Sequence, residues 1–341
     1  MATPVQIRRL SPEDLAQAYY VAQARQARRT ADRVQTLWRE LDRRDLTGSW
    51  ESLVGPEIVR AVALGQAAAA SGSDEYVTAV AIAEGDVPDV SGRVRTAAFA
   101  GRAADGRSLD SLLYLPVITT KESMAAGLDE TESMMRGLNQ LLRMAASEVA
   151  DAGRGATGVA ITASRTINGY VRVVNPPACA RCIILAGKEF GWNAGFQRHP
   201  KCDCVHLPAK LIKRGRHHPG AFDSKAYFHG LSAREQDRIF TAAGARAIRD
   251  GASMSSVVNA RRGMYTADAY RRRLAATREG TTRRGAFYRA ERAAAIARGR
   301  VPASGRGFQL RTPRLLPEEI YRLAGSRDEA IAMLRRFGYL D

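Results

Sequence analysis

All four cysteines of the 341-residue chain lie within one window of 26 residues, and the other 315 residues contain none. They form two short groups, Cys179-Ala-Arg-Cys182 and His199-Pro-Lys-Cys202-Asp-Cys204. Thiolates and imidazole are ligands that tetrahedral Zn²⁺ prefers, and paired cysteines at such spacings are typical of zinc sites. The window therefore predicts a bound zinc ion.

This window offers more ligands than a tetrahedron needs. The candidates are Cys179, Cys182, His199, Cys202 and Cys204. We favour the first three cysteines together with either His199 or Cys204, because the intervening residues 183–198 are long enough to bring the two groups together. A filled four-ligand set is structural, since a catalytic zinc keeps one position open for water.

His206 offers a sixth candidate ligand, and Asp203 and His206 are otherwise expected to orient or neutralise the zinc site. Two disulfides, four unrelated thiols or a Cys–His nucleophile pair are the alternatives. Disulfides need an oxidising compartment, and residues 1–10 lack the apolar segment of a signal peptide. A Cys–His nucleophile pair needs only one reactive thiol, so it would leave the other three cysteines of the window unexplained.

The elements that must position this window are mainly helical. Ser11 precedes Pro12 and two acidic residues, which predicts a helix start, and this helix is expected to reach residues 42–45. Further helical segments are expected at 56–70 and, after Lys121, up to residue 152. Residues 77–82 are expected to be a short extended or helical piece.

From residue 156 onward, β-branched residues such as Ile161 and the run 170–174 predict strands and loops. The expected fold is therefore mainly α with a small α+β zinc-knuckle module in the middle. Three regions follow: a helical N-terminal region for protein contacts at 1–155, the zinc module at 156–209, and a basic helical region at 210–341.

Three helices are expected in the C-terminal region. Capping-box patterns begin at Ser232 and Ser326, and the first helix is expected to end at Gly251. Thr266 is expected to cap another helix that ends near Gly280.

Positive charge is concentrated in the same region. The formal net charge is +17, yet residues 1–204 carry 24 Lys and Arg against 23 Asp and Glu, whereas residues 205–341 carry 28 against 12. Such an excess attracts polyanions, DNA above all. Because 46 of the 52 basic residues are Arg, a GC-rich genome is an alternative explanation for their type, although not for their position. The candidate phosphate contacts are Arg261, Arg262, Arg271, Arg272, Arg273, Arg283 and Arg284, and each is equally explained as a solvated surface residue.

No uninterrupted apolar run approaches the 18 residues that a membrane span needs. The sequence therefore predicts a soluble protein without a membrane partner.

Two stretches resemble a known family. The run Asn175-Pro-Pro-Ala-Cys-Ala-Arg-Cys182 with His199-Pro-Lys-Cys-Asp-Cys-Val-His-Leu-Pro208 is similar to the zinc-knuckle signature of the MuF-like minor head proteins of tailed bacteriophages. The downstream runs 231–240, 243–251 and 257–263 resemble members from phages of actinobacteria. Residues 1–150 match only in being helical and preceding the motif.

This resemblance implies a non-enzymatic protein of the procapsid and virion interior, made in the host cytoplasm and present in few copies. Its implied partners are the portal protein, the major capsid or scaffold proteins and packaged double-stranded DNA. It implies a role in head assembly, with DNA packaging or ejection as further roles.

Two enzymatic functions are alternatives to this role. A capsid maturation protease that uses histidine as its base cannot be housed in residues 1–198, because all five histidines lie between His199 and His229. A zinc-dependent nuclease or toxin-like module needs an accessible metal position, which a thiol-rich window does not obviously leave.

Overall fold

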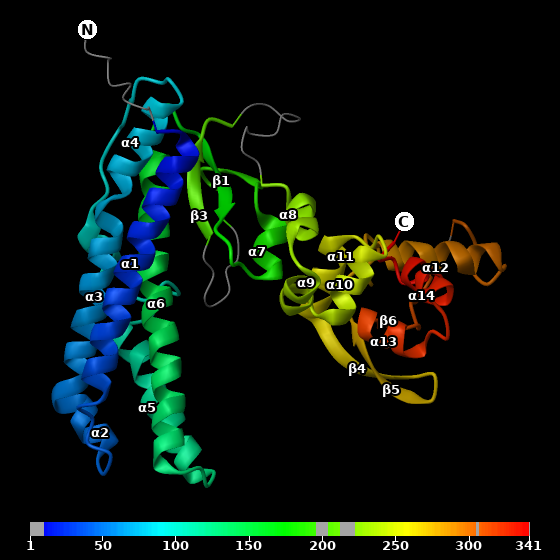
Figure 1. Ribbon diagram of the computed structural model, residues 1–341, viewed down its shortest axis with the longest axis horizontal. Coiled ribbons are helices and arrows are strands. Elements are labelled where there is room, and N and C mark those ends of the chain that lie inside the picture. Colours follow the sequence, from blue (N-terminus) through cyan, green and yellow to red (C-terminus); the bar gives the residue numbers. More distant parts are fainter. Residues whose placement is uncertain (1–9, 196–203, 212–221, 305–306, 341) are drawn as a thin grey trace. The chain divides into compact units, whose positions relative to one another are not determined.

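The chain is mostly helical, at 60%, with two small three-stranded antiparallel sheets, which confirms the mainly α fold class. The structure is a computed structural model (Figure 1). It describes residues 10–195, 204–211, 222–304 and 307–340. Two compact units make up the chain. Unit 1 comprises Met1–Pro176 and Ala186–Phe222, and unit 2 comprises Pro177–Leu185 and Asp223–Asp341.

Unit 1 is a bundle of long helices followed by a small sheet. Its helices are α1 (Pro12–Trp38), α2 (Leu46–Ser49), α3 (Gly55–Ser71), α4 (Ser73–Ala83), α5 (Leu109–Ala125) and α6 (Glu130–Ala163), with a π-helical turn at Trp50–Val54 and a 3₁₀ turn at Thr96–Phe99. The predicted start of α1 is confirmed, since the Ser11 hydroxyl accepts from the Asp14 amide and the Asp14 carboxylate accepts from the Ser11 amide, both at 3.1 Å. The helix ends at Trp38, short of the expected 42–45.

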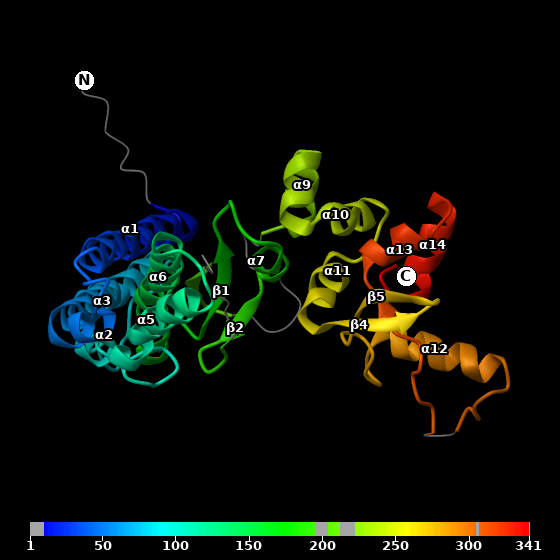
Figure 2. The same cartoon turned by 90° about the horizontal axis from the view of Figure 1, so that it is seen from below.

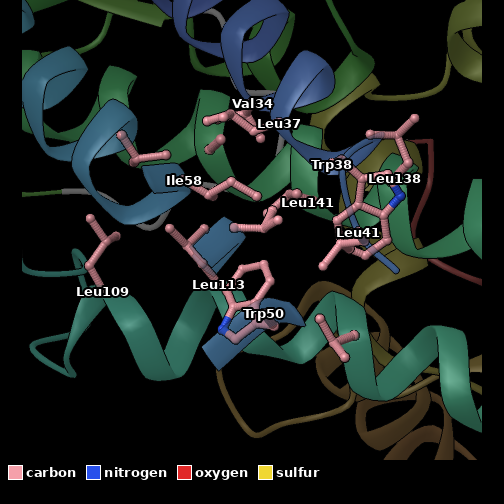
Figure 3. Packing of buried hydrophobic residues seen from close by; sticks show 14 of the residues in the cluster. Val34, Leu37, Trp38, Leu41, Trp50, Ile58, Leu109, Leu113, Leu138 and Leu141 are labelled. Atoms are coloured by element: carbon pink, nitrogen blue, oxygen red, sulfur yellow. The ribbon is translucent and has the colours of Figure 1, made fainter. Parts of the chain in front are cut away.

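The apolar core of unit 1 lies between α1, α3, α5 and α6. Figure 3 shows Val34 and Trp38 of α1, Ile58 of α3, Leu113 of α5 and Leu141 of α6 converging on one another. All five side chains are buried. Apolar residues at helical spacing thus position the bundle, as periodicity predicts.

Glycine permits a close helix crossing in this bundle. A Cβ atom on Gly137 of α6 would lie 2.0 Å from Thr120 Oγ1 and 2.8 Å from the carbonyl oxygen of Pro116, both on α5. Because real Cβ atoms do not approach so closely, only glycine fits where α5 and α6 meet.

Besides the end of α1, two predicted boundaries in unit 1 were wrong. Helix α5 starts at Leu109 rather than after Lys121, because Ser108 caps it and Pro116 is tolerated inside it. Helix α6 continues to Ala163, past the expected change at residue 156. Tertiary burial overrides the β-branched residues there: Ile161 packs in a cluster with Val77. Residues 77–82, predicted to be extended or helical, lie within helix α4, which confirms the helical alternative.

The stretch Leu46–Ala83 is long and apolar enough to cross a membrane by length and composition alone. It is interrupted, however, by the boundaries between α2, the π-helical turn, α3 and α4. Of its most apolar window 44% is buried, and Val54, Ile58 and Val62 belong to the bundle core. These features are typical of core helices in a helical bundle.

The first sheet completes unit 1, with strands β1 (Gly169–Val174), β2 (Glu189–Gly191) and β3 (Cys204–Ala209) in the order β2-β1-β3. The strand predicted at 170–174 is confirmed. Val171 pairs with Leu207, and both pack on Tyr76 of α4 and Ala16 of α1. Because side chains alternate along a strand, Arg172, Cys204 and His206 belong to the opposite face.

Unit 2 contains short helices and the second sheet. Its elements are α7 (Ala180–Leu185), α8 (Ser224–Gly230), α9 (Ala233–Phe240), α10 (Ala242–Arg249), α11 (Met254–Ala260), a 3₁₀ turn (Arg261–Gly263), β4 (Met264–Ala269), β5 (Arg272–Thr277), α12 (Ala286–Ala297), β6 (Arg314–Leu315), α13 (Pro317–Leu323) and α14 (Arg327–Arg336). The caps predicted at Ser232 and Ser326 are confirmed, since each hydroxyl accepts from the amide three residues on.

The prediction of a helix from Thr266 to Gly280 was wrong, because this segment forms the hairpin of β4 and β5. Leu274 and Ala276 are buried while Arg273 is exposed. Burial at every second residue is typical of a strand. The sheet order is β4-β5-β6, and β6 pairs only with the last two residues of β5. The Thr266 hydroxyl therefore lies in a strand and caps nothing.

The helix expected from Ser232 to Gly251 is divided at Thr241, whose backbone has φ 67° and ψ 155°. This conformation is almost confined to glycine. The Thr241 hydroxyl caps α10 by accepting from the Gly244 amide at 3.3 Å. At Thr241, therefore, backbone strain lowers the stability of the fold while the hydroxyl cap raises it.

Replacing this residue separates the two effects. Thr241→Gly is expected to raise the free energy of unfolding of unit 2 by about 1 kcal/mol, because it releases backbone strain and glycine is a tolerable cap. Thr241→Ala keeps the strain and loses the cap, so it is expected to lower that free energy by about 1 kcal/mol. Urea unfolding of both variants measures the difference, and equal effects would contradict the strain argument.

Candidate metal centre and candidate nucleic-acid interface

Cys204 begins strand β3 and is fully buried. Its Sγ accepts two hydrogen bonds from the guanidinium of Arg172 on β1, from Nε at 3.1 Å and from Nη2 at 3.0 Å. Arg172 pairs with His206 in the sheet. Cys204 lies two residues before His206, so it is the diagonal neighbour of Arg172 on the same face of the sheet. Arg172 is only 1% exposed. A buried cation thus donates to the sulfur of one predicted ligand.

Further contacts hold this end of the sheet. Arg154 of α6 donates from Nε to the carbonyl oxygen of Cys204 at 2.8 Å and from Nη1 to Asp151 at 2.9 Å. The ring of His206 stacks on Tyr170, with centroids 4.0 Å apart, and its carbonyl oxygen accepts from the Tyr76 hydroxyl at 3.0 Å. His206, predicted to support the metal, therefore lies on the same face of the sheet as Cys204 in unit 1.

The first cysteine pair belongs to unit 2. Cys182 is buried on α7, and Cys179 is exposed just before that helix, where its carbonyl oxygen accepts from the Ile183 amide. His199, Cys202 and Asp203 lie outside the described residues. Among the residues that the structure does describe, no group of three or more His, Cys, Asp or Glu side chains is placed to hold a metal ion. The predicted ligand set therefore remains a prediction.

The seven candidate arginines all belong to unit 2 and are all exposed. Arg271 lies in the hairpin turn, Arg272 and Arg273 begin β5, and Arg283 and Arg284 lie between β5 and α12. Across residues 261–314 there are 15 Arg and three acidic residues. The cationic excess is therefore centred on the hairpin and the segments that flank it.

One candidate, Arg261, is already engaged within unit 2. Its guanidinium forms an ion pair with Glu318 of α13 and donates to the Thr241 hydroxyl at 3.0 Å. Although Arg261 is exposed, partial burial of its guanidinium lowers the pKa of Arg261. These contacts indicate a structural role that ties the end of α11 to α13.

The hairpin turn has an unusual composition. Ala269 pairs with Arg272, which leaves Tyr270 and Arg271 as a two-residue turn, and both have positive φ, 52° and 58°. Such a type I′ turn usually contains Asn and Gly, because other side chains are strained there. Both turn residues are exposed, Tyr270 to 49%. A strained turn therefore presents an aromatic ring and a cation to solvent.

Comparison of the chain with protein-family models, with curated proteins and with solved structures finds no match. The family resemblance of the sequence motifs therefore supports a proposal and does not assign a family.

Proposed function

We propose that this chain is a MuF-like minor head protein of a tailed bacteriophage, an assembly protein rather than an enzyme. The observation that carries the proposal is the separation of its charge. Residues 223–341, nearly all of unit 2, carry 24 Lys and Arg against 12 acidic residues, whereas residues 1–204 are almost balanced. The motifs across residues 170–265 support the same assignment.

This separation suits a protein that joins two kinds of partner. A long helical bundle of nearly balanced charge offers surface for protein contacts with the portal and the major capsid or scaffold proteins. A compact cationic unit offers phosphate contacts, which are electrostatic and independent of sequence. Both kinds of contact are needed where packaged double-stranded DNA meets the inside of a head.

The proposal is tested on particles of the phage or prophage that encodes the chain. Mass spectrometry of purified procapsids and virions is expected to detect the protein in few copies per particle. Its absence from both would overturn the proposal. Cleavage of the major capsid protein on co-expression would favour a protease instead, and nicking of DNA with added divalent metal would favour a nuclease.

The proposal includes a structural Zn²⁺ held by Cys179, Cys182, Cys202 and either His199 or Cys204. The Arg172–Cys204 contact supports this chemistry, because charge-assisted N–H donors stabilise a sulfur that carries negative charge, and the thiolate is the form that binds metal. A bound zinc would link the two ends of the 26-residue cysteine window and so stabilise the fold. Arg172 would also offset part of the negative charge of a Cys204 thiolate.

Removing one ligand tests the metal. Cys182→Ser is expected to abolish the roughly one zinc per chain measured by elemental mass spectrometry. It should also reduce amide-exchange protection across residues 170–210 while leaving the centres of α1 and α6 unchanged. His229→Asn is the control, because His229 is exposed on α8 outside the cysteine window. Unchanged metal content and equal melting of wild type and Cys182→Ser would refute a structural zinc.

A further inference from the structure

The hairpin of β4 and β5 has an exposed outer part that packing within unit 2 does not explain. Its base is anchored, since Leu274 and Ala276 are fully buried and β6 pairs with the end of β5. Its outer part, residues 268–273, is exposed at every position except Ala269. In Figure 1 this ribbon extends away from the helices of unit 2, and Figure 2 shows its strands β4 and β5 side by side in the view from below.

The charge of the ribbon is strongly positive. Residues 261–278 contain six Arg and a single acidic residue, Asp268. Asp268 pairs across the ladder with Arg273, and no ion pair of Arg271, Arg272 or Arg273 is found with any carboxylate of the described residues. These guanidinium groups are therefore available to an anionic partner.

The turn adds a second, independent indication. Two non-glycine residues adopt left-handed backbone conformations at its tip, although Asn and Gly would relieve the strain. Strain of this kind is often found where a side chain is needed for binding. The residues maintained at this cost are Tyr270 and Arg271, at the end furthest from the core.

We propose that this hairpin inserts into the major groove of duplex DNA, with Arg271 reaching base edges and Arg272 and Arg273 contacting the phosphates on either side. A two-stranded ribbon fits a major groove about 12 Å wide and 8.5 Å deep. The two outer residue pairs of the ladder, Asp268–Arg273 and Ala269–Arg272, together with the turn beyond them extend roughly 10 Å, at about 3.3 Å per residue. The exposed length therefore matches the depth of the groove.

This inference rests on the DNA contact in the proposed function and makes it specific. It names the element that enters the groove and separates the roles of three neighbouring arginines. A phosphate contact changes the salt dependence of binding, whereas a base-edge contact changes protection of the bases.

The test measures binding of the full-length protein to a fluorescent 30-base-pair duplex by anisotropy, across a series of salt concentrations. The double variant Arg272→Gln/Arg273→Gln is expected to lose affinity by on the order of tenfold and to lower the salt slope by about 2. Arg298→Gln/Arg300→Gln is the matched control, because it removes two exposed charges from unit 2 outside the hairpin. Equal losses in the two variants would show that charge alone acts, which overturns the proposal.

The role of the turn residues in binding is tested with a variant whose residues suit the turn conformation better than the wild-type residues do. Tyr270→Asn/Arg271→Gly supplies the residues that a type I′ turn prefers, so its melting temperature should equal or exceed that of wild type. It is nevertheless expected to lose the protection of guanine N7 from dimethyl sulfate, a major-groove reagent, that the wild-type protein gives. Wild-type binding without such protection, or tighter binding to a 30-nucleotide single strand, overturns groove insertion.

Failure of this inference is distinguishable from failure of the proposed function. Particles assembled with the hairpin variants are expected to contain the protein at wild-type levels, because the bundle of unit 1 is unchanged. Absence of the wild-type protein from particles refutes the head-protein proposal, whatever the hairpin binds in solution.

Discussion

Replacing Arg314 with methionine is expected to lower the free energy of unfolding of unit 2 by about 3–5 kcal/mol. The Arg314 side chain is 3% exposed and lies 4.1 Å from the ring centroid of Tyr339. Its guanidinium donates to the carbonyl oxygens of Phe337 at 2.7 Å, Glu279 at 2.9 Å and Gly338 at 3.0 Å, and to the Ser256 hydroxyl at 2.8 Å.

The physical reason is the number of acceptors that one cation satisfies. Those four partners come from α11, from the segment after β5 and from the C-terminal end of α14. Burial lowers the pKa of Arg314, so the charge is costly, but removing it would leave several buried acceptors without a donor. Arg314→Lys supplies a point charge in place of the planar fork and is expected to be intermediate.

Urea unfolding followed by circular dichroism measures the effect. Arg311→Met, a change at an exposed arginine three residues earlier, is the control and is expected to alter stability by less than about 0.5 kcal/mol. A loss no larger than that of the control would show that Arg314 does not hold these segments together.

Leu141→Ala is expected to lower the free energy of unfolding of unit 1 by about 3–5 kcal/mol. Leu141 lies on α6 with no exposed surface, among side chains from α1, α3 and α5 (Figure 3). Truncation removes apolar contacts and leaves a cavity that long, mutually packed helices cannot readily close.

Met135→Ala on the same helix is the matched comparison, because Met135 is 51% exposed and shares the helical context. Its expected effect is below about 0.5 kcal/mol. Denaturant unfolding monitored by tryptophan fluorescence reports on this core, since Trp38 and Trp50 belong to it. Similar losses for both variants would mean that the bundle is not the stabilising core of unit 1.

Local signals predicted many of the element starts. The caps at Ser11, Ser232 and Ser326 depend on residues only three positions apart, and such short-range chemistry can be read directly from a sequence. The strand at 170–174 was likewise found from its β-branched residues. Helix α6 was cut short because Ile161 and Thr162 look strand-like, whereas burial of Ile161 decides the outcome.

The hairpin and the contact of Cys204 could not be found in this way. Tyr270-Arg271 carries no turn signal, since Asn-Gly is the pair that marks such turns. Arg172 and Cys204 are 32 residues apart, and only the register of β1 and β3 makes them neighbours. Long-range pairing of this kind leaves no local pattern. An isolated arginine within an apolar strand is the signal that could have indicated a buried partner.

The assignment of α7 to unit 2 has a consequence for the order in which the protein folds. The chain contributes Pro177–Leu185 to that unit, returns to unit 1, and supplies the remainder only from Asp223 onward. Helix α7 contacts α11, which the ribosome makes some seventy residues later. During synthesis α7 is therefore made well before the helix it packs against. A separately expressed fragment 223–341 would lack this helix and expose the surface of α11 that it covers.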